Sequence, residues 1–374
     1  MDLNLTIEQK LIKEEAAKFL KKECPYSRVK EIEESAAGYS PELWKKMAEL
    51  GWLGLAFPEN YGGDGGQFFE LILLQEEMGK AVLPAPFFST VVQCGSIILT
   101  GGSEEQKREL LPEIAGGNLI LSLAQYEENG SYHLSDLDMQ VERNGDRFVL
   151  NGTKMFVSDA NIADKLIVVV KTGHNEYSLL LVDARDPGIS VTKMPTIAMD
   201  NTCEVIFDNV KTSTENLIGE AGTAIPILDE VNARASILKV AEMVGASKAC
   251  IDMTADYAKQ REQYGKPIGG FQIIQHYMAN MLLEYDTCYN YLYRTGCMVD
   301  AGEDFHRDSS ALKACVNQAY KFISERAIQI HGGIGTTREA DVGLFYRKAK
   351  SSEFACGDTE LHYEKVFESL IQDV

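Results

Sequence analysis

The stretch "KQREQYGKPIGGFQIIQHYMANM", residues 259–281, joins two long segments that both have the apolar periodicity of helices. The segment before it runs back to residue 224, and the one after it continues to residue 302. A third such segment, residues 309–333, ends in "QIHGG". Helices of this length, separated by glycine-containing loops, are typical of an up-and-down bundle. We therefore expect a C-terminal helical bundle over residues 218–374.

Residues 119–217 have a different period. Short aliphatic and β-branched runs such as "KLIVVVKT" and "CEVIFDNV" alternate here with turn residues. Asn144-Gly145-Asp146 and Asn151-Gly152 are hairpin signals, because Asn and Gly tolerate a positive φ. Several short strands at this spacing predict a central antiparallel β-barrel or sandwich domain.

Residues 1–118 are predicted to form an N-terminal helical domain. Thr6 to Gln9 and Ser103 to Gln106 both fit the capping box that opens a helix. Ser40-Pro41 adds a helix cap followed by proline at the first helical position. The glycine-rich stretch 57–66 is expected to be a loop between helices. The predicted fold class is therefore α+β, in the order helices, strands, helical bundle.

The charge of the chain limits its partners. It carries 36 basic and 56 acidic side chains, a formal net charge of -20. Such a surface repels nucleic acid and anionic membranes. No apolar stretch is long enough to span a membrane, and the N-terminus lacks the pattern of a signal peptide. No G-x-G-x-x-G follows a predicted strand, so no Rossmann nicotinamide site is expected.

The eight cysteines contain no C-x-x-C pair and form no cluster with histidine. Scattered singly through apolar segments, they are interpreted as reduced core residues. This usage predicts a cytoplasmic protein without a metal site.

Three stretches together resemble the acyl-CoA dehydrogenase family of flavoproteins. They are residues 144–169, "NGDRFVLNGTKMFVSDANIADKLIVV"; the opening stretch, in which Tyr264 replaces the family's usual phenylalanine; and residues 327–350, "AIQIHGGIGTTREADVGLFYRKAK". The resemblance implies a helical domain, a β domain and a four-helix bundle, assembled as a homotetramer or heterotetramer. It also implies FAD between the β domain and the bundle.

The resemblance implies α,β-desaturation of an acyl-CoA thioester, with electrons leaving through an electron-transferring flavoprotein. In this family a carboxylate takes the α proton and flavin N5 takes the β hydride. Matching positions imply FAD contacts for Arg261 at the pyrophosphate and for an aromatic and a hydroxyl at the flavin ring, Phe156 and Ser158. The other implied cofactor residues are Gln125, Ser131, Phe271, Gln272, Gln329, Gly332, Gly333 and Gly357. The loop that carries Gln125 departs from the family pattern, since Tyr126-Glu127 and Tyr132 replace its usual residues.

The two positions where the family keeps its catalytic glutamate do not hold one here. The first, the turn before the last helix, holds Cys356. The second, on the first long helix of the bundle, holds Ala235, followed by Ser236. Ser131, Ala235 and Ser236 are the implied substrate contacts.

Three explanations for the missing glutamate remain open at this point. The base has moved, and Asp358 is then the nearest carboxylate along the turn. Glu230 and Glu242 lie more than a helical turn from Ala235, and Tyr126 and His331 are weaker candidates.

Alternatively, Cys356 acts as a thiolate, activated by the start of the following helix. In the third explanation the subunit is catalytically silent beside a glutamate-bearing partner, or it carries out a flavin-dependent elimination that needs no α-proton abstraction. The expected activity is oxidation of a non-standard CoA thioester with an alicyclic, branched or polycyclic acyl group. The alternative is a silent partner subunit of a heterotetramer.

Overall fold

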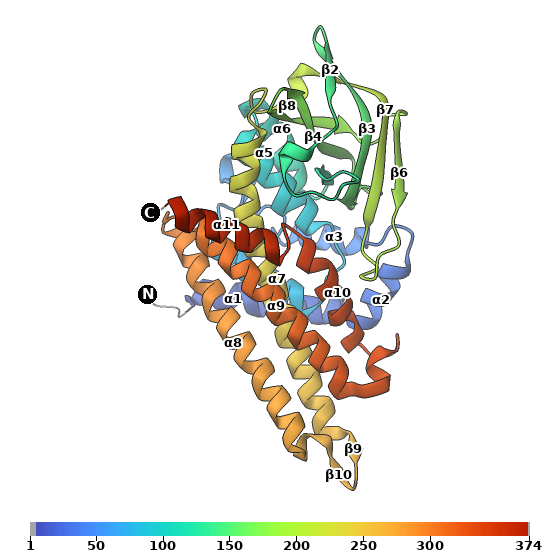
Figure 1. Ribbon diagram of the computed structural model, residues 1–374, viewed down its shortest axis with the longest axis vertical. Coiled ribbons are helices and arrows are strands. Elements are labelled where there is room, and N and C mark those ends of the chain that lie inside the picture. The colour runs from blue at the N-terminus through green and yellow to red at the C-terminus, as the bar shows by residue number, and fades with distance from the viewer. Residues whose placement is uncertain (1–4, 373–374) are drawn as a thin grey trace. The chain divides into compact units, whose positions relative to one another are not determined.

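The structure, a computed structural model, describes residues 5–372 (Figure 1). Residues 1–4 and 373–374, which the predicted first and third domains include, lie outside this range. Helices and strands follow the expected order of helices, strands and helices. The helices are α1 (Ile7–Glu23), α2 (Tyr26–Glu34), α3 (Pro41–Glu49), α4 (Phe68–Lys80), α5 (Ser96–Gly101), α6 (Glu104–Ala115), α7 (Ala224–Gln260), α8 (Gln272–Asp300), α9 (His306–His331), α10 (Val342–Phe354) and α11 (Thr359–Gln372).

The helix caps read from the sequence are confirmed. The Thr6 side chain accepts a hydrogen bond from the backbone N–H of Gln9 at 3.2 Å, and Ser103 does the same for Gln106. Both capping boxes are complete, since each glutamine bonds back to the backbone of its cap. Ser40 caps α3 ahead of its proline.

Two four-stranded sheets form the middle of the chain. One has the order β1-β4-β5-β8 and the other β2-β3-β7-β6. Their facing side chains share one buried apolar cluster, so the arrangement is a sandwich and the sheets do not close into a barrel. The strands are β1 (Leu121–Ala124), β2 (Val141–Asn144), β3 (Arg147–Ser158), β4 (Lys165–Gly173), β5 (Glu176–Asp183), β6 (Ile189–Lys193), β7 (Thr202–Ser213) and β8 (Leu217–Ile218).

Details of the sheets differ from the sequence predictions. Gly145 and Asp146 do form the two-residue turn between β2 and β3. The hairpin predicted at Asn151-Gly152 is wrong, because both residues lie inside β3, where the register against β7 shifts. A bulge and a hairpin both select glycine at positive φ, and Gly152 has φ 146°. In addition, β1 pairs with β4 in parallel.

The described chain divides into two compact units. One comprises residues up to Glu31, Gln67–Leu83 and everything from Ala233 onward; the other comprises Ile32–Gly66 and Pro84–Asn232. These units cut across the three predicted domains 1–118, 119–217 and 218–374, whose boundaries stay a prediction. The two sheets belong to the second unit.

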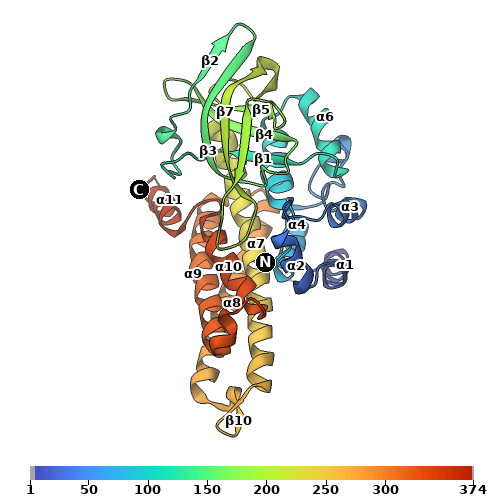
Figure 2. The same cartoon turned by 90° about the vertical axis from the view of Figure 1, so that its right-hand side faces the viewer.

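In the first unit, α4 crosses α7 with their backbones in contact. A Cβ on Gly79 would lie 1.9 Å from the carbonyl oxygen of Glu242, and one on Gly245 equally close to that of Glu76. Only glycine permits this approach. Beyond the crossing, α7 and α8 extend to a tip formed by β9 (Glu262–Gln263) and β10 (Lys266–Pro267), as Figure 2 shows.

Candidate functional site

An aromatic side chain projects from β3 at the position implied to face the flavin. Phe156 has φ 57°, a conformation that is rare for a bulky residue, and its side chain is 48% exposed. The register of β3 against β7 shifts between Lys154 and Val157. Val157 points into the sandwich core while Ser158 is exposed. The bulge therefore presents an aromatic ring and a hydroxyl away from the core, and such backbone strain gathers at ligand sites.

A buried ion pair fastens the loop that carries Gln125 to the same strand. The Lys154 ammonium donates to Glu127 Oε1 at 2.7 Å and to the Gln125 carbonyl at 3.3 Å. The Met155 amide donates to the carbonyl of Tyr126 at 2.9 Å. Burial lowers the pKa of Lys154 to about 8, against the raising effect of Glu127. The structure thus brings Gln125 next to the Phe156 bulge.

The hydroxyl of Ser131 is engaged within its own loop. It donates to Asp136 Oδ2 at 2.7 Å and accepts from the backbone N–H of His133. The ring of Tyr126 packs edge-on against Tyr132, 5.7 Å between centroids. This ring contact packs the divergent part of the loop together. It gives the base candidate Tyr126 a packing role.

In the helical unit, the connection between α7 and α8 carries three of the implied cofactor residues. Arg261 directly follows α7 and is exposed, and among residues 5–372 its guanidinium has no hydrogen bond or ion pair. The ring of Phe271 lies 4.4 Å below the Lys266 ammonium, and Gln272 opens α8 as an exposed residue. An exposed guanidinium without an acceptor suits a phosphate ligand.

The end of α9 presents Gln329, Gly332 and Gly333. Gln329 is exposed, and Gly332 ends the helix with φ 66°, which glycine adopts readily. A Cβ on Gly333 would meet nothing within 4 Å. The described fold therefore does not require glycine at position 333, whereas close approach of a phosphate to the backbone does.

His331 has a structural role at the end of α9. Its ring stacks on Tyr257, 4.3 Å between centroids, and its Nδ1 lies 2.8 Å from the Ala327 carbonyl. Burial lowers its pKa. Because Tyr257 lies one turn before the end of α7, this stack holds the α7 and α9 ends together. A buried ring with a lowered pKa, held by stacking and by a hydrogen bond, is a weak base candidate.

The turn before α11 has an unusual backbone at the position of the family glutamate. Cys356 has φ 61° and Gly357 φ 109°. A Cβ on Gly357 would lie 2.6 Å from Leu361, so glycine is required there. His362 Nε2 lies 3.1 Å from the Cys356 carbonyl and donates to it. Gly357 is thus explained by the turn itself.

A buried lysine on α9 forms hydrogen bonds to this turn. Lys313, which is fully buried, donates to the carbonyls of Ser352, Glu353 and Gly357 at 3.1 to 3.2 Å. It also donates to Asn317 Oδ1 at 2.6 Å. All four partners are neutral, and burial lowers the pKa of Lys313 to about 7. Sequence analysis missed this residue because its contacts are remote along the chain.

The thiol of Cys356 is poorly placed to be a base. Burial raises its pKa, and the charge of Glu242 adds to this, while the positive charges of Lys313, Lys239 and Lys365 oppose it. The net direction is upward, so the protonated thiol predominates at neutral pH. The upward direction disfavours the thiolate that the sequence analysis considers at the start of α11.

The nearest carboxylates have different surroundings. Asp358 Oδ1 accepts the backbone N–H of Leu361 at 3.0 Å and thereby caps the first turn of α11. Glu230 belongs to the other compact unit. Glu242 forms an ion pair with Lys239 at 2.6 Å. Asp358 therefore caps a helix, whereas Glu242 does not.

Glu242 shares a face of α7 with Ala235, the second position that the family resemblance implies for the glutamate. Ala235, Lys239 and Glu242 are spaced by four and three residues, which places them along one stripe of the helix. Ala235 and Ser236 are both buried. The shared stripe of Ala235 and Glu242 can be recognised from the sequence once the helical repeat is applied to this segment.

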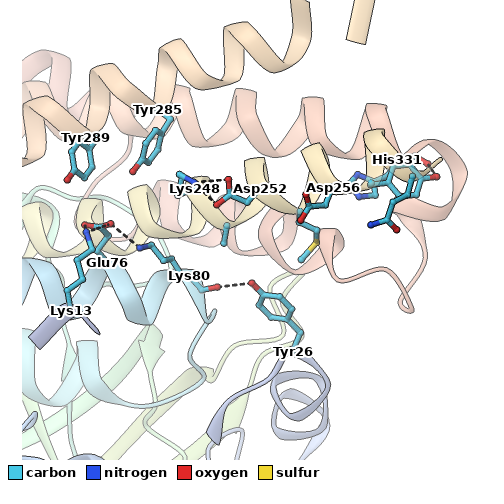
Figure 3. A pocket seen from close by; sticks show the side chains of 14 residues that line it. Lys13, Tyr26, Glu76, Lys80, Lys248, Asp252, Asp256, Tyr285, Tyr289 and His331 are labelled. Atoms are coloured by element: carbon cyan, nitrogen blue, oxygen red, sulfur yellow. Dashed lines mark hydrogen bonds and ion pairs between the residues drawn. The ribbon is translucent and has the colours of Figure 1, made fainter. Parts of the chain in front are cut away.

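A groove of about 750 Å³ lies elsewhere in the helical unit (Figure 3). Glu76 is buried at its base and pairs with Lys13 at 2.8 Å and with Lys80 at 3.3 Å. Lys248 pairs with Asp252. The lining contains three acidic residues and three lysines: Glu76, Asp252 and Asp256, and Lys13, Lys80 and Lys248. The groove therefore offers no net charge to an anionic thioester, and of the candidate bases it includes only His331.

Within residues 5–372, no helix is long and apolar enough to span a membrane. Nor does the same range contain a group of three or more His, Cys, Asp or Glu side chains arranged to hold a metal ion.

Comparison with known proteins identifies three matching family models, which follow one another along the chain. The acyl-CoA dehydrogenase N-terminal domain matches residues 6–118, the middle domain 122–210 and the C-terminal domain 232–371.

Individual proteins give the same result. The chain is 32% identical to a probable acyl-CoA dehydrogenase, YngJ, of Bacillus subtilis, over 96% of this chain and 97% of that protein. Butyryl-CoA dehydrogenase from Megasphaera elsdenii superposes with a TM-score of 0.91 at 27% identity, covering 99% of this chain and 100% of that one. A chain from a structure described as the electron transferring flavoprotein of Acidaminococcus fermentans superposes with a TM-score of 0.92 at 27% identity, over 99% of both chains.

Proposed function

Because the chain belongs to the acyl-CoA dehydrogenase family, whose members are FAD-dependent, we propose that it oxidises the acyl group of a non-standard CoA thioester. The observation that carries this proposal is the ordered match of all three family domains between residues 6 and 371. The fold alone would not specify a reaction.

The cofactor proposal rests first on Arg261, whose guanidinium has no hydrogen bond or ion pair within residues 5–372. The exposed Arg261 would donate to the pyrophosphate, and Gly332 and Gly333 would let the backbone approach the same anion. Phe156 and Ser158 would contact the ring system, with Gln125 beside them. When bound, FAD supplies the hydride acceptor. Phe271, Gln272 and Gln329 are proposed to complete the contacts, as the family positions imply.

We assign the missing base to Glu242. Its side chain lies 2.6 Å from the Lys239 ammonium, and a positioned carboxylate can act as a general base. It lies on the stripe of α7 that carries Ala235, and its charge acts on the thiol of Cys356. In this proposal Glu242 takes the proton from the acyl group, and Lys239 holds its side chain in place. Asp358 is the second candidate, despite its use as a helix cap.

The acyl group is proposed to be bulky: alicyclic, branched or polycyclic. The family positions for glutamate hold the smaller side chains of Cys356 and Ala235, and Ser236 follows where many relatives have arginine. These substitutions favour a wider group at the reacting end of the thioester. Ser131 is retained as a proposed contact to the flavin or the substrate.

The proposed electron acceptor is an electron-transferring flavoprotein, in keeping with the description of one similar structure. The proposed assembly is a tetramer, of identical or different subunits. Consistent with this, the last helix carries apolar side chains that are at least 48% exposed within the single chain: Tyr363, Phe367, Leu370 and Ile371.

The alternative, a silent partner subunit, differs in a simple observable. Purified alone, an enzyme shows the visible absorption of bound FAD, and this absorption bleaches when the right CoA thioester is added without oxygen. A panel of straight-chain, branched and cyclic thioesters is the direct experiment. A colourless chain that gains flavin only when co-produced with a second subunit supports the silent role.

A further inference from the structure

Two cysteines face each other across the contact between α8 and α9. The sulfur atoms of Cys288 and Cys315 lie 4.0 Å apart and form a hydrogen bond. Within residues 5–372 no other two cysteines are bonded to each other. The sequence gives no sign of this pair, because 27 positions separate its members.

The two thiols are unequal. Cys288 is 2% exposed, whereas Cys315 is partly exposed and can be reached from solvent. The hydrogen bond with Cys288 lowers the pKa of Cys315, although burial and the charge of Glu284 act against it. The same bond, together with burial, raises the pKa of Cys288. Because Cys315 is the partly exposed thiol, it is the one that an external disulfide can reach, and its thiolate is the nucleophile in disulfide exchange.

We propose that Cys288 and Cys315 form a redox-active dithiol, a modification site that closes to a disulfide between α8 and α9. The oxidant is a small disulfide such as oxidised glutathione. The Cys315 thiolate attacks one sulfur of this molecule and expels one thiolate, leaving a mixed disulfide on Cys315. Cys288 then loses its proton, attacks the Cys315 sulfur and expels the second thiolate. Two protein thiols are oxidised and one small disulfide is reduced to two thiols.

The two sulfur atoms must approach from 4.0 Å to the roughly 2 Å of a disulfide bond. Both residues lie inside long helices that pack side by side, so the cross-link joins elements that are already neighbours. The reaction is independent of the proposed dehydrogenase activity and needs no substrate.

Peptide mapping tests the proposal on the full chain. The protein is incubated with oxidised glutathione, its remaining thiols are blocked, and it is digested with trypsin. Cleavage places Cys288 in peptide 262–294 and Cys315 in peptide 314–321, each as the single cysteine. We expect these two peptides to be joined, and to separate on reduction with dithiothreitol.

Three variants distinguish this reaction from general oxidation. In Cys288→Ser, glutathione is expected to remain attached at Cys315, since no thiol resolves the adduct. In Cys315→Ser, the buried Cys288 is expected to stay unmodified. Cys297→Ser, a partly buried cysteine outside the pair, is the matched control and should cross-link like the wild type. Absence of the joined peptides from oxidised, folded wild type would overturn the proposal, as would adduct formation on Cys288 in the Cys315→Ser variant.

Discussion

The side-chain nitrogen of Lys313 lies 3.2 Å from the carbonyl oxygen of Gly357, the residue that follows Cys356. This contact joins α9 to the turn before α11, the first position that the family resemblance implies for the catalytic glutamate. Lys313 has four neutral partners and, within the described residues, no carboxylate partner. Hydrogen bonds from the Lys313 side chain to neutral acceptors therefore hold the turn that carries Cys356.

Replacing this lysine should loosen the turn. Lys313→Met keeps an apolar stem but removes the donor that the buried carbonyls of Ser352 and Gly357 share. We expect the free energy of unfolding to fall by about 3 kcal/mol, measured by denaturant titration. Lys259→Met, at an exposed lysine, is the control and should change little. A Lys313→Met protein as stable as this control would show that the contacts contribute nothing.

The same lysine should make stability depend on pH. Its pKa is lowered to about 7 in the folded chain and returns towards the ordinary 10.5 on unfolding. Between these values the unfolded chain binds the extra proton. This residue therefore makes the free energy of unfolding rise with pH, by up to about 1.4 kcal/mol per pH unit.

Denaturant titrations at several pH values between 7 and 10 check this. The wild-type stability minus that of Lys313→Met should increase with pH. A difference that stays constant or decreases across this range contradicts the lowered pKa.

Restoring the acid at the turn should restore ordinary chemistry. Cys356→Glu would place a carboxylate near Lys313, whose charge lowers the pKa of the present thiol. We expect oxidation of a straight-chain CoA thioester to accelerate ~100-fold or more, the usual contribution of a general base. Cys356→Gln has nearly the same shape without the charge and is the control. Equal rates for the two variants would mean that position 356 does not face the acyl group.

Arg261 should affect cofactor affinity. A guanidinium that donates to phosphate contributes about 1.5–3 kcal/mol, so Arg261→Met should weaken FAD binding roughly 10- to 100-fold. Equilibrium dialysis of the assembled protein against FAD measures this. Arg294→Met, at another exposed arginine, is the comparison variant. Unchanged FAD affinity in Arg261→Met would remove this residue from the proposed cofactor site.

Much of the fold could be predicted because it depends on local patterns. The caps at Thr6, Ser40 and Ser103 are written within four residues each, and the change of hydrophobic period marks the β region. The short strands β6 and β8 were not predicted. The bulge at Asn151-Gly152 was predicted as a hairpin, because the same residue types favour both.

The candidate site was less predictable for a physical reason. The motifs of the site match the family along the chain, but the contacts that hold its side chains in place join positions that are far apart in the sequence. Lys313 reaches residues 39 to 44 positions away, and the Cys288 and Cys315 thiols meet across two helices. Glu242 lies about two helical turns from Ala235, as the sequence predicts, and the helical repeat places both on one stripe of α7.

The most direct test of the central claim, oxidation of a CoA thioester without a base at position 356, is anaerobic bleaching of the bound flavin. The thioester that the panel identifies is mixed with wild type, Cys356→Ala and Glu242→Gln, with Glu230→Gln as control, each loaded with FAD. We predict fast bleaching of wild type, Cys356→Ala and Glu230→Gln, and bleaching of Glu242→Gln slowed ~100-fold or more. A wild-type protein that holds FAD but is bleached by no thioester, or whose bleaching is lost in Cys356→Ala, would contradict the claim.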